Sequence, residues 1–173
     1  MSGEQLIVFT AGCNGMKIYE FITLLQTHSI QTVIDTRRNT HYQGVREYGT
    51  HKLPAHLRDA EIAYRHELDL APTKLIRDAF KNDYTQHAWQ HFLEAYEHHI
   101  AHTDPLKNNP EFAQLIENSQ RILLLCTEEH FEDCHRHVAA EYLKKNLPNV
   151  VIEHLMKHRP KRDEHKLRTR GVR

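Results

Sequence analysis

The segment from Cys126 to Arg136 carries the side chains best suited to chemistry in this 173-residue chain. It reads Cys-Thr-Glu-Glu-His-Phe-Glu-Asp-Cys-His-Arg and joins an apolar strand pattern to a helix pattern. Cys134 is expected in the first turn of that helix, where free N–H groups and the positive end of the helix dipole favour a thiolate. His135 and Arg136 add positive charge, whereas the four acidic residues between the cysteines oppose both a thiolate and an incoming anion.

Three interpretations of these thiols remain open. Cys126 or Cys134 could be a nucleophile, with Asp35 or a histidine as the acid or base. Alternatively, Cys126, Cys134 and His135 could bind a metal, with Cys13 as a fourth ligand. The thiols could also be small buried groups, with only arginine and aspartate side chains contacting a ligand. The segment is longer than the cysteine-to-arginine loop of a phosphatase and has no glycine, which argues against an anion cradle of that type.

The hydrophobic pattern indicates the scaffold that must position these residues. Five short apolar runs of strand type alternate with amphipathic helix patterns, and the runs fall at 6–9, 32–34, 62–64, 122–125 and 150–152. The run Ile122–Leu125 is fully apolar, as expected for a central parallel strand. The alternation predicts the α/β class: a three-layer sandwich with a mostly parallel central sheet flanked by helices, in a Rossmann-like arrangement.

A sheet of this kind binds ligands outside the carboxyl ends of its strands. Asp35 ends the second strand and is our first choice for a general base or a ribose-binding carboxylate. Arg37 and Arg136 suit bidentate recognition of phosphate or carboxylate, although Arg37 could instead pair with Asp35. The catalytic candidates are Asp35, Cys126, Cys134 and His135. The substrate-binding candidates are Thr10, Gly12, Asn14, Arg37, Arg38, His66 and Arg136.

Other conspicuous residues point to packing. Trp89 and Tyr96 share one face of an amphipathic helix and are expected in the core rather than at a ligand. His87 and His91 lie four residues apart on the same helix and could share a metal, but the HExxH pattern is absent and a solvated face is favoured. The sequence completes no metal-ligand pattern and identifies no cofactor.

The chain is formally neutral, yet its charge is unevenly distributed. Residues 157–173 contain eight basic and two acidic side chains, against 15 and 21 in residues 1–156. We therefore expect one α/β domain, 1–156, followed by a basic tail, 157–173, that is either solvated or in contact with nucleic-acid phosphates. No apolar run is long enough to span a bilayer and no export leader is visible, so with three cysteines a reducing, cytoplasmic setting is expected.

Several motifs resemble the family catalogued as domain of unknown function 488, from about Ile7 to about Leu155. They occur in the family's order: Thr10-Ala-Gly12-Cys13-Asn14, Asp35-Thr-Arg37, Leu70-Ala71-Pro72-Thr73, Ile76-Arg77-Asp78, Leu124-Leu125-Cys126 and Cys134-His135-Arg136. The last two form the most specific signature. One departure follows Asp35-Thr-Arg37, where the family often has a proline and a serine and this chain has Arg38-Asn39. The resemblance implies the α/β fold and nominates the same site without defining a reaction.

Three functional hypotheses follow. The first is an enzyme acting on a nucleotide-like or nucleic-acid-linked substrate, with Asp35 as acid or base, Arg37 and Arg136 as an anion clamp, and a cysteine as nucleophile. The second is a non-catalytic module that binds a small molecule or nucleic acid through the same pocket and the tail. The third is a metal or haem site built from the thiols and histidines. The sequence identifies neither the reaction, nor the natural ligand, nor the oligomeric state.

Overall fold

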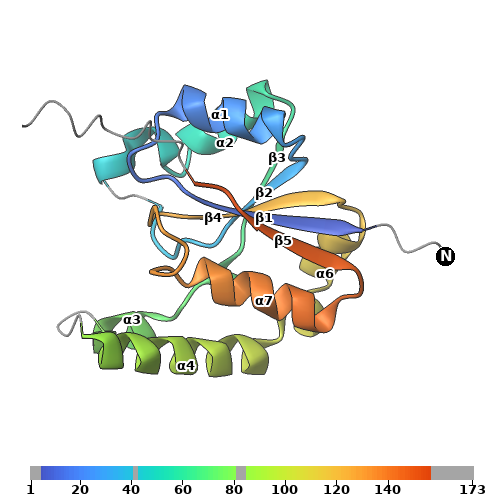
Figure 1. Ribbon diagram of the computed structural model, residues 1–173. Helices are drawn as coiled ribbons and strands as arrows, with labels where there is room; N and C mark the ends of the chain where they lie inside the picture. The colour runs from blue at the N-terminus through green and yellow to red at the C-terminus, as the bar shows by residue number, and fades with distance from the viewer. Residues whose placement is uncertain (1–4, 41–42, 81–84, 157–173) are drawn as a thin grey trace, which may run out of the picture.

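Five parallel strands form a single sheet in the computed structural model, which describes residues 5–40, 43–80 and 85–156 (Figure 1). The spatial order is β3-β2-β4-β1-β5. The strands are β1 (Leu6–Gly12), β2 (Thr32–Asp35), β3 (Ala63–His66), β4 (Arg121–Cys126) and β5 (Val150–His154). The apolar run at 122–125 thus forms the central strand, and the predicted three-layer α/β class is confirmed. The expected basic tail, 157–173, lies outside the described residues.

Helices cover both faces of this sheet. The α-helices are α1 (Ile18–Thr27), α2 (Lys52–Asp59), α3 (Lys74–Phe80), α4 (Gln86–Thr103), α5 (Pro105–Asn108), α6 (Pro110–Glu117) and α7 (Arg136–Asn146). Two short 3₁₀ helices, η1 (Gln43–Tyr48) and η2 (Leu68–Leu70), lie in the connections after β2 and β3. In Figure 1, α1 and α2 lie above the sheet, and α4, α6 and α7 lie below it. Within the described ranges, no helix is both long enough and apolar enough to cross a bilayer.

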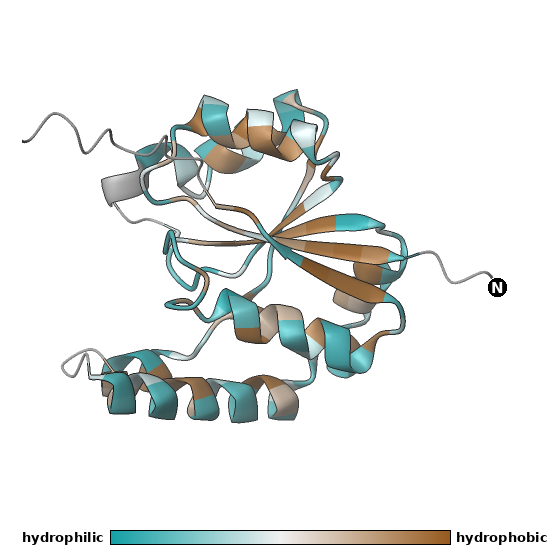
Figure 2. Cartoon of the chain, viewed as in Figure 1, coloured by the Kyte–Doolittle hydropathy of each residue, from teal (hydrophilic) through white to brown (hydrophobic). Residues whose placement is uncertain are grey.

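The period-two alternation of a strand divides the interior into two cores. Along β4, Ile122 and Leu124 face the lower core, while Leu123 and Leu125 face the upper one. Phe21 of α1 completes the upper core, and Phe112 of α6 is fully buried in the lower core. Burial of each such side chain contributes about 1.5–3 kcal/mol. Figure 2 shows the same division, with apolar strands inside and polar helix faces outside.

The chain connections open a crevice at the carboxyl end of β4. The connections that follow β1 and β2 cross the upper face through α1 and α2, whereas the connection after β4 leaves through α7 on the lower face. Because β4 lies between β1 and β2, the chain diverges on both sides of its end. Ligand sites of open α/β sheets form at such points. The strand register places Gly12 opposite Cys126 and Asp35 opposite Leu125 at this edge.

The start of α7 differs from our prediction. The helix begins at Arg136 with His135 at the N-cap position, so Cys134 lies in the preceding turn rather than in the first helical turn. The carbonyl of Phe131 accepts a hydrogen bond from the Cys134 N–H, which turns the chain before the helix begins. The helix dipole therefore acts on this thiol less directly than the sequence suggested.

Candidate functional site

The loop between β4 and α7, residues 127–135, forms the centre of the site. It passes so close to β1 that a Cβ atom on Gly12 would overlap the carbonyl group of Glu128. The N–H groups of Cys13 and Asn14 donate to the carbonyls of Cys126 (3.0 Å) and Thr127 (2.9 Å), which extends the β1–β4 pairing into the loop. The turn after β1 therefore uses these N–H groups to hold the loop.

Arg136 fixes the other side of this loop. Its guanidinium is fully buried and donates from Nη1 to the Glu128 carbonyl (2.6 Å) and from Nη2 to the Glu129 carbonyl (2.9 Å). Hydrogen bonds from a charged donor of this kind contribute about 1.5–3 kcal/mol each. This placement differs from the expected anion clamp, because the donors serve the protein backbone.

Four potential ligand atoms converge where the loop meets the end of β4. Cys126, Glu128, Cys134 and His135 form this group, which we call the thiol cluster, and their Sγ, carboxylate and ring nitrogen atoms all lie within 4.8 Å of one another. Glu128 Oε2 accepts from Cys126 Sγ (2.8 Å) and from Cys134 Sγ (3.2 Å). Nδ1 of His135 lies 3.7 Å from Cys126 Sγ, and Nε2 lies 3.2 Å from the carbonyl oxygen of Thr36. Sequence reasoning had singled out three of these residues and missed Glu128.

Burial controls the electrostatics of this cluster. It raises the pKa of Cys126 and raises that of Cys134 well above the usual value. Burial also opposes the charged form of Glu128, but the hydrogen bonds from the thiols outweigh it and lower the pKa of that carboxyl. Both sulfurs are therefore thiols that donate to a carboxylate at neutral pH. This arrangement does not favour a free nucleophilic thiolate.

Asp35 and Arg37 form a buried ion pair beside the cluster. Asp35 Oδ1 accepts from Arg37 Nε (2.8 Å) and Oδ2 from Nη2 (2.6 Å), and the hydroxyl of Tyr64 also donates to Oδ2 (3.0 Å). The same Nη2 atom donates to the carbonyl of Tyr48 (2.7 Å). Asp35 is fully buried with both oxygens engaged, so the salt bridge that we held as the alternative is present and the expected general base has no free oxygen facing a ligand.

The thiol of Cys13 lies next to this ion pair. Arg37 Nη1 is 3.9 Å from Cys13 Sγ, and burial, only partly offset by the charge of Arg37, raises the pKa of this thiol to about 11. Cys13 packs in the upper core and is not among the residues of the thiol cluster. It therefore behaves as a buried apolar group, the role that we considered most typical of an isolated cysteine.

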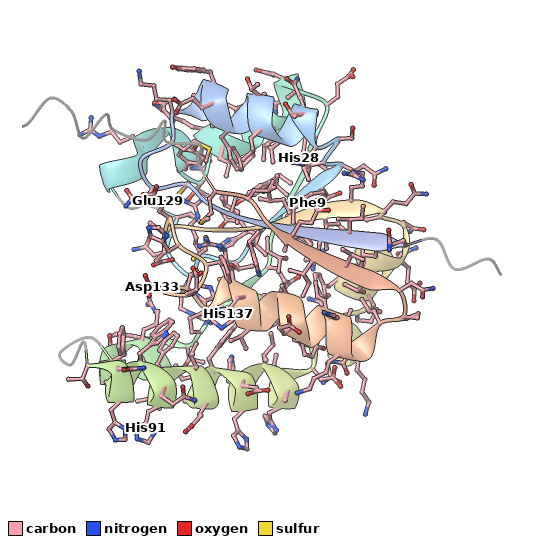
Figure 3. All side chains as sticks on the ribbon, in the orientation of Figure 1. Phe9, His28, His91, Glu129, Asp133 and His137 are labelled. Carbon is pink, nitrogen blue, oxygen red and sulfur yellow. The ribbon has the colours of Figure 1, made fainter. Side chains whose placement is uncertain are left out.

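A cleft of about 730 Å³ opens over the thiol cluster. It extends from the carboxyl edge of the sheet to α3 and the start of α4. All four cluster residues line it, together with Asn14, Arg37, Arg38, Asn39, Pro72, Lys74, Arg77, Asp78, Phe80, Trp89, Phe92, Thr127 and Asp133. Figure 3 shows Asp133 on the loop directly above α3 and α4.

Three cationic side chains, Arg38, Lys74 and Arg77, form the part of the lining that we call the cationic wall, and the carboxylates of Asp78, Glu128 and Asp133 line the same cleft. Arg38 is held by the carbonyls of Pro72 (2.7 Å to Nε) and Ala71 (3.0 Å to Nη2). Arg38 and Arg77 both line the cleft, and burial together with the nearby charge of Arg77, partly offset by Asp69, lowers the pKa of Arg38. In the part of the chain that the structure describes, no carboxylate lies within 4.0 Å of Arg38, Lys74 or Arg77. Only Arg38 among these three was a sequence candidate.

Three aromatic side chains, Phe80, Trp89 and Phe92, form another part of the lining, which we call the aromatic wall. Trp89 stacks on Phe92 with centroids 4.9 Å apart and planes 11° apart, and Phe80 packs against both rings. Tyr96, further along α4, is fully buried as expected and donates from its hydroxyl to the Leu70 carbonyl (2.8 Å). Trp89, which we had expected in the core, is only half-buried and lines the cleft. The available signal for a position at the cleft was its place near the start of α4, the helix that follows Lys74 and Arg77 in the sequence.

Four other residues considered from the sequence, Thr10, His66, His87 and His91, do not line the cleft. Thr10 is buried within β1, where its hydroxyl lies 2.8 Å from His154 Nδ1 of β5. His66 contacts the carbonyl of Arg37 through Nε2 (2.6 Å). His87 and His91 approach each other at 3.0 Å on the outer side of α4, and Figure 3 shows His91 pointing away from the molecule. Only Asn14 of the turn after β1 reaches the cleft lining.

One family model covers most of the chain. The family model described as Domain of unknown function DUF488 matches residues 17–143, and the chain belongs to this family. The match includes the ion pair, both cleft walls and the thiol cluster, whereas the turn after β1 that we had included in the resemblance precedes it. Searches of curated proteins and of solved structures found no match.

Proposed function

We propose that this protein binds a nucleotide-like ligand, an anionic phosphate joined to a flat ring, in the cleft at the carboxyl edge of the sheet. The observation that carries the proposal is that one cleft is lined both by Arg38, Lys74 and Arg77, which form no salt bridge with a described carboxylate, and by stacked aromatic rings. Guanidiniums suit the fork geometry of phosphate, and an aromatic face suits a base. The thiol cluster lies on the floor of the cleft, where any reaction of the bound ligand would take place.

The expected affinities follow from these two walls. A charged hydrogen bond to phosphate contributes about 1.5–3 kcal/mol, and stacking of a base contributes about 1–3 kcal/mol. AMP should therefore bind more tightly than either adenosine or inorganic phosphate alone. Arg77→Ala should weaken AMP binding on the order of ten-fold.

Trp89 is the single tryptophan of the chain, so its fluorescence reports directly on the cleft. AMP, adenosine and inorganic phosphate would each be titrated into the full chain, with calorimetry as a second readout. Arg58→Ala, at an exposed position on α2, is the matched control and should leave AMP affinity unchanged. The proposal fails if millimolar AMP changes neither signal, or if the Arg58 and Arg77 variants weaken binding equally.

A longer ligand tests the nucleic-acid hypothesis with the same readout. A single-stranded oligonucleotide should bind with a steeper salt dependence than AMP if residues 157–173 contact its phosphates. Deletion of those residues should then reduce the salt slope for the oligonucleotide and leave AMP binding unchanged. An unchanged slope would show that residues 157–173 do not contact the phosphates of the oligonucleotide.

A further inference from the structure

The four side chains of the thiol cluster have the composition of a transition-metal site. Two sulfurs, one imidazole and one carboxylate are a donor set of the kind that binds Zn²⁺, whereas Mg²⁺ and Ca²⁺ favour oxygen ligands. The four residues come from the end of β4 and the following loop, which Gly12 and Arg136 hold in place. Their backbone positions are thus fixed by contacts that do not involve the cluster side chains themselves.

One of the three measured sulfur distances already matches a tetrahedral zinc site, and the two that involve Glu128 are shorter. Around a zinc ion with ordinary bond lengths, neighbouring ligand atoms lie about 3.5–3.8 Å apart when sulfur is one of the pair. Cys126 Sγ lies 3.7 Å from His135 Nδ1, and Glu128 Oε2 lies 2.8 and 3.2 Å from the two sulfurs. All ligand atoms lie within 4.8 Å of one another. Metal binding therefore requires side-chain adjustments of about an ångström and no backbone rearrangement.

His135 also has the surroundings of a metal ligand. A ligating histidine usually donates its second ring N–H to a backbone carbonyl or a carboxylate, which fixes the ring orientation. Nε2 of His135 lies 3.2 Å from the carbonyl oxygen of Thr36, while Nδ1 faces Cys126 Sγ. The ring of Tyr96 packs edge-on against the imidazole with centroids 5.4 Å apart. Both ring nitrogens lie near Cys126 Sγ, Nδ1 at 3.7 Å and Nε2 at 3.9 Å, and Nδ1 is the one without the Thr36 carbonyl contact.

We infer that Cys126, Cys134, His135 and Glu128 bind one Zn²⁺ ion at the floor of the cleft. On binding, each S–H bond breaks, its proton passes to the buffer, and a sulfur–zinc bond forms. Glu128, which accepts both thiol hydrogen bonds without the metal, becomes the oxygen ligand. It is the exposed member of the set, so the ion reaches the site through the cleft. The inference is independent of the ligand proposed above.

Co²⁺ is the probe for the experiment, because tetrahedral cobalt with thiolate ligands gives thiolate-to-metal charge-transfer absorption and intense visible bands. Reduced, metal-free full-length chain would be titrated with Co²⁺ and then with Zn²⁺, which should displace it. We expect one ion per chain, release of protons on binding, and loss of the charge-transfer signal in Cys126→Ser and Cys134→Ser.

Cys13→Ser is the matched control, because it removes the third thiol of the chain outside the cluster and should retain the full cobalt spectrum. Glu128→Gln covers the case in which a cysteine variant does not fold: it keeps the size of the side chain, removes the anionic oxygen ligand and should weaken cobalt binding at least about ten-fold. Circular dichroism would verify the fold of each variant.

Three results would overturn the inference. The first is the absence of tetrahedral cobalt bands in the folded, reduced chain. The second is an equal loss of signal in the Cys13 and Cys134 variants. The third is a Cys126–Cys134 disulfide in the purified protein together with no metal binding after reduction, which would identify the pair as a redox couple. AMP titration of the metal-free chain separates these results from failure of the nucleotide proposal, since the cationic and aromatic walls contain no proposed metal ligand.

Discussion

The guanidinium of Arg136 lies 2.6 Å from the carbonyl oxygen of Glu128, so the first residue of α7 holds the backbone of the loop that precedes the helix. This contact links the Cys-His-Arg signature of the sequence to a structural task. The cysteine and histidine reach into the cleft, while the arginine turns inward and fixes the loop that carries them.

Replacement of Arg136 should therefore destabilise the fold. Arg136→Leu leaves the carbonyls of Glu128 and Glu129 without this donor, and we expect a loss of about 2–4 kcal/mol in the free energy of unfolding. Urea denaturation followed by circular dichroism measures the effect. Arg58→Leu, at an exposed position, should stay within about 0.5 kcal/mol of the parent chain. Equal stability of the two variants would show that the buried guanidinium does not hold the loop.

Gly12 is expected to tolerate no side chain. A methyl group at this position would overlap the Glu128 carbonyl, so Gly12→Ala should displace the loop and cost on the order of 3 kcal/mol in thermal or urea unfolding. Gly49→Ala is the comparison, because its nearest contact, the Arg46 carbonyl at 3.2 Å, needs a shift of only a few tenths of an ångström. If both alanine variants lost the same stability, the close approach of β1 to the loop would not be the cause.

Asp35→Asn distinguishes a structural carboxylate from a general base. The variant leaves the buried Arg37 guanidinium without its counter-charge, and breaking a buried ion pair in this way costs about 3–5 kcal/mol. Tyr64→Phe, which removes one neutral donor to the same carboxylate, should cost about 1 kcal/mol. If the Asp35→Asn chain were as stable as the parent, the structural role of Asp35 would be contradicted and the hypothesis of a general base would be favoured again.

His154 makes stability sensitive to acid. Burial, reinforced by the charges of Arg136 and His137, lowers its pKa below the unfolded value of 6.5. Below that pH, His154 is protonated in the unfolded chain but resists protonation in the folded chain. The free energy of unfolding therefore decreases as the pH is lowered. At pH 7.5 the neutral ring contacts Thr10 and stacks on Phe131 with centroids 3.7 Å apart.

His154→Gln should be less stable than the parent chain at pH 7.5, because it loses these contacts, and the difference should narrow at pH 5.5. Free energies of unfolding in urea at the two pH values provide the measurement. A gap that widens on acidification would contradict the lowered pKa.

The sequence predicted the framework better than the use of individual charges. The apolar run Ile122–Leu125 and the alternation of patterns were sufficient for a parallel sheet, and parallel strands necessarily gather Asp35 and Cys126 at one edge. Whether an arginine faces a ligand or the protein depends on carbonyls that spacing does not reveal. The guanidinium of Arg37 donates to the carbonyl of Tyr48, which lies eleven residues later in the chain. The guanidinium of Arg136 donates to a carbonyl of the loop that precedes it.

The residues of the cationic and aromatic walls could not be predicted from the sequence for a related reason. Lys74 and Arg77 belong to α3, whose Ile76-Arg77-Asp78 motif supports the family resemblance but predicts no contact with the thiols. Packing of Phe80 against Trp89 and Phe92 joins this helix to α4 beside the cleft. Such contacts between helices follow from side-chain packing, which local pattern does not contain. Glu128 was visible as an acidic residue between two cysteines, but its role depends on the turn that returns Cys134 toward Cys126.

The divergence of the chain around β4 means that the parts of the cleft are encoded more than a hundred positions apart, from Asn14 to His135. No contiguous fragment of half this length could form the cleft. Ligand binding in the cleft therefore requires the folded state and is lost when the chain unfolds. A molecule that occupies the cleft will accordingly act as a pharmacological chaperone, raising the melting temperature in proportion to the logarithm of its concentration once the cleft is saturated.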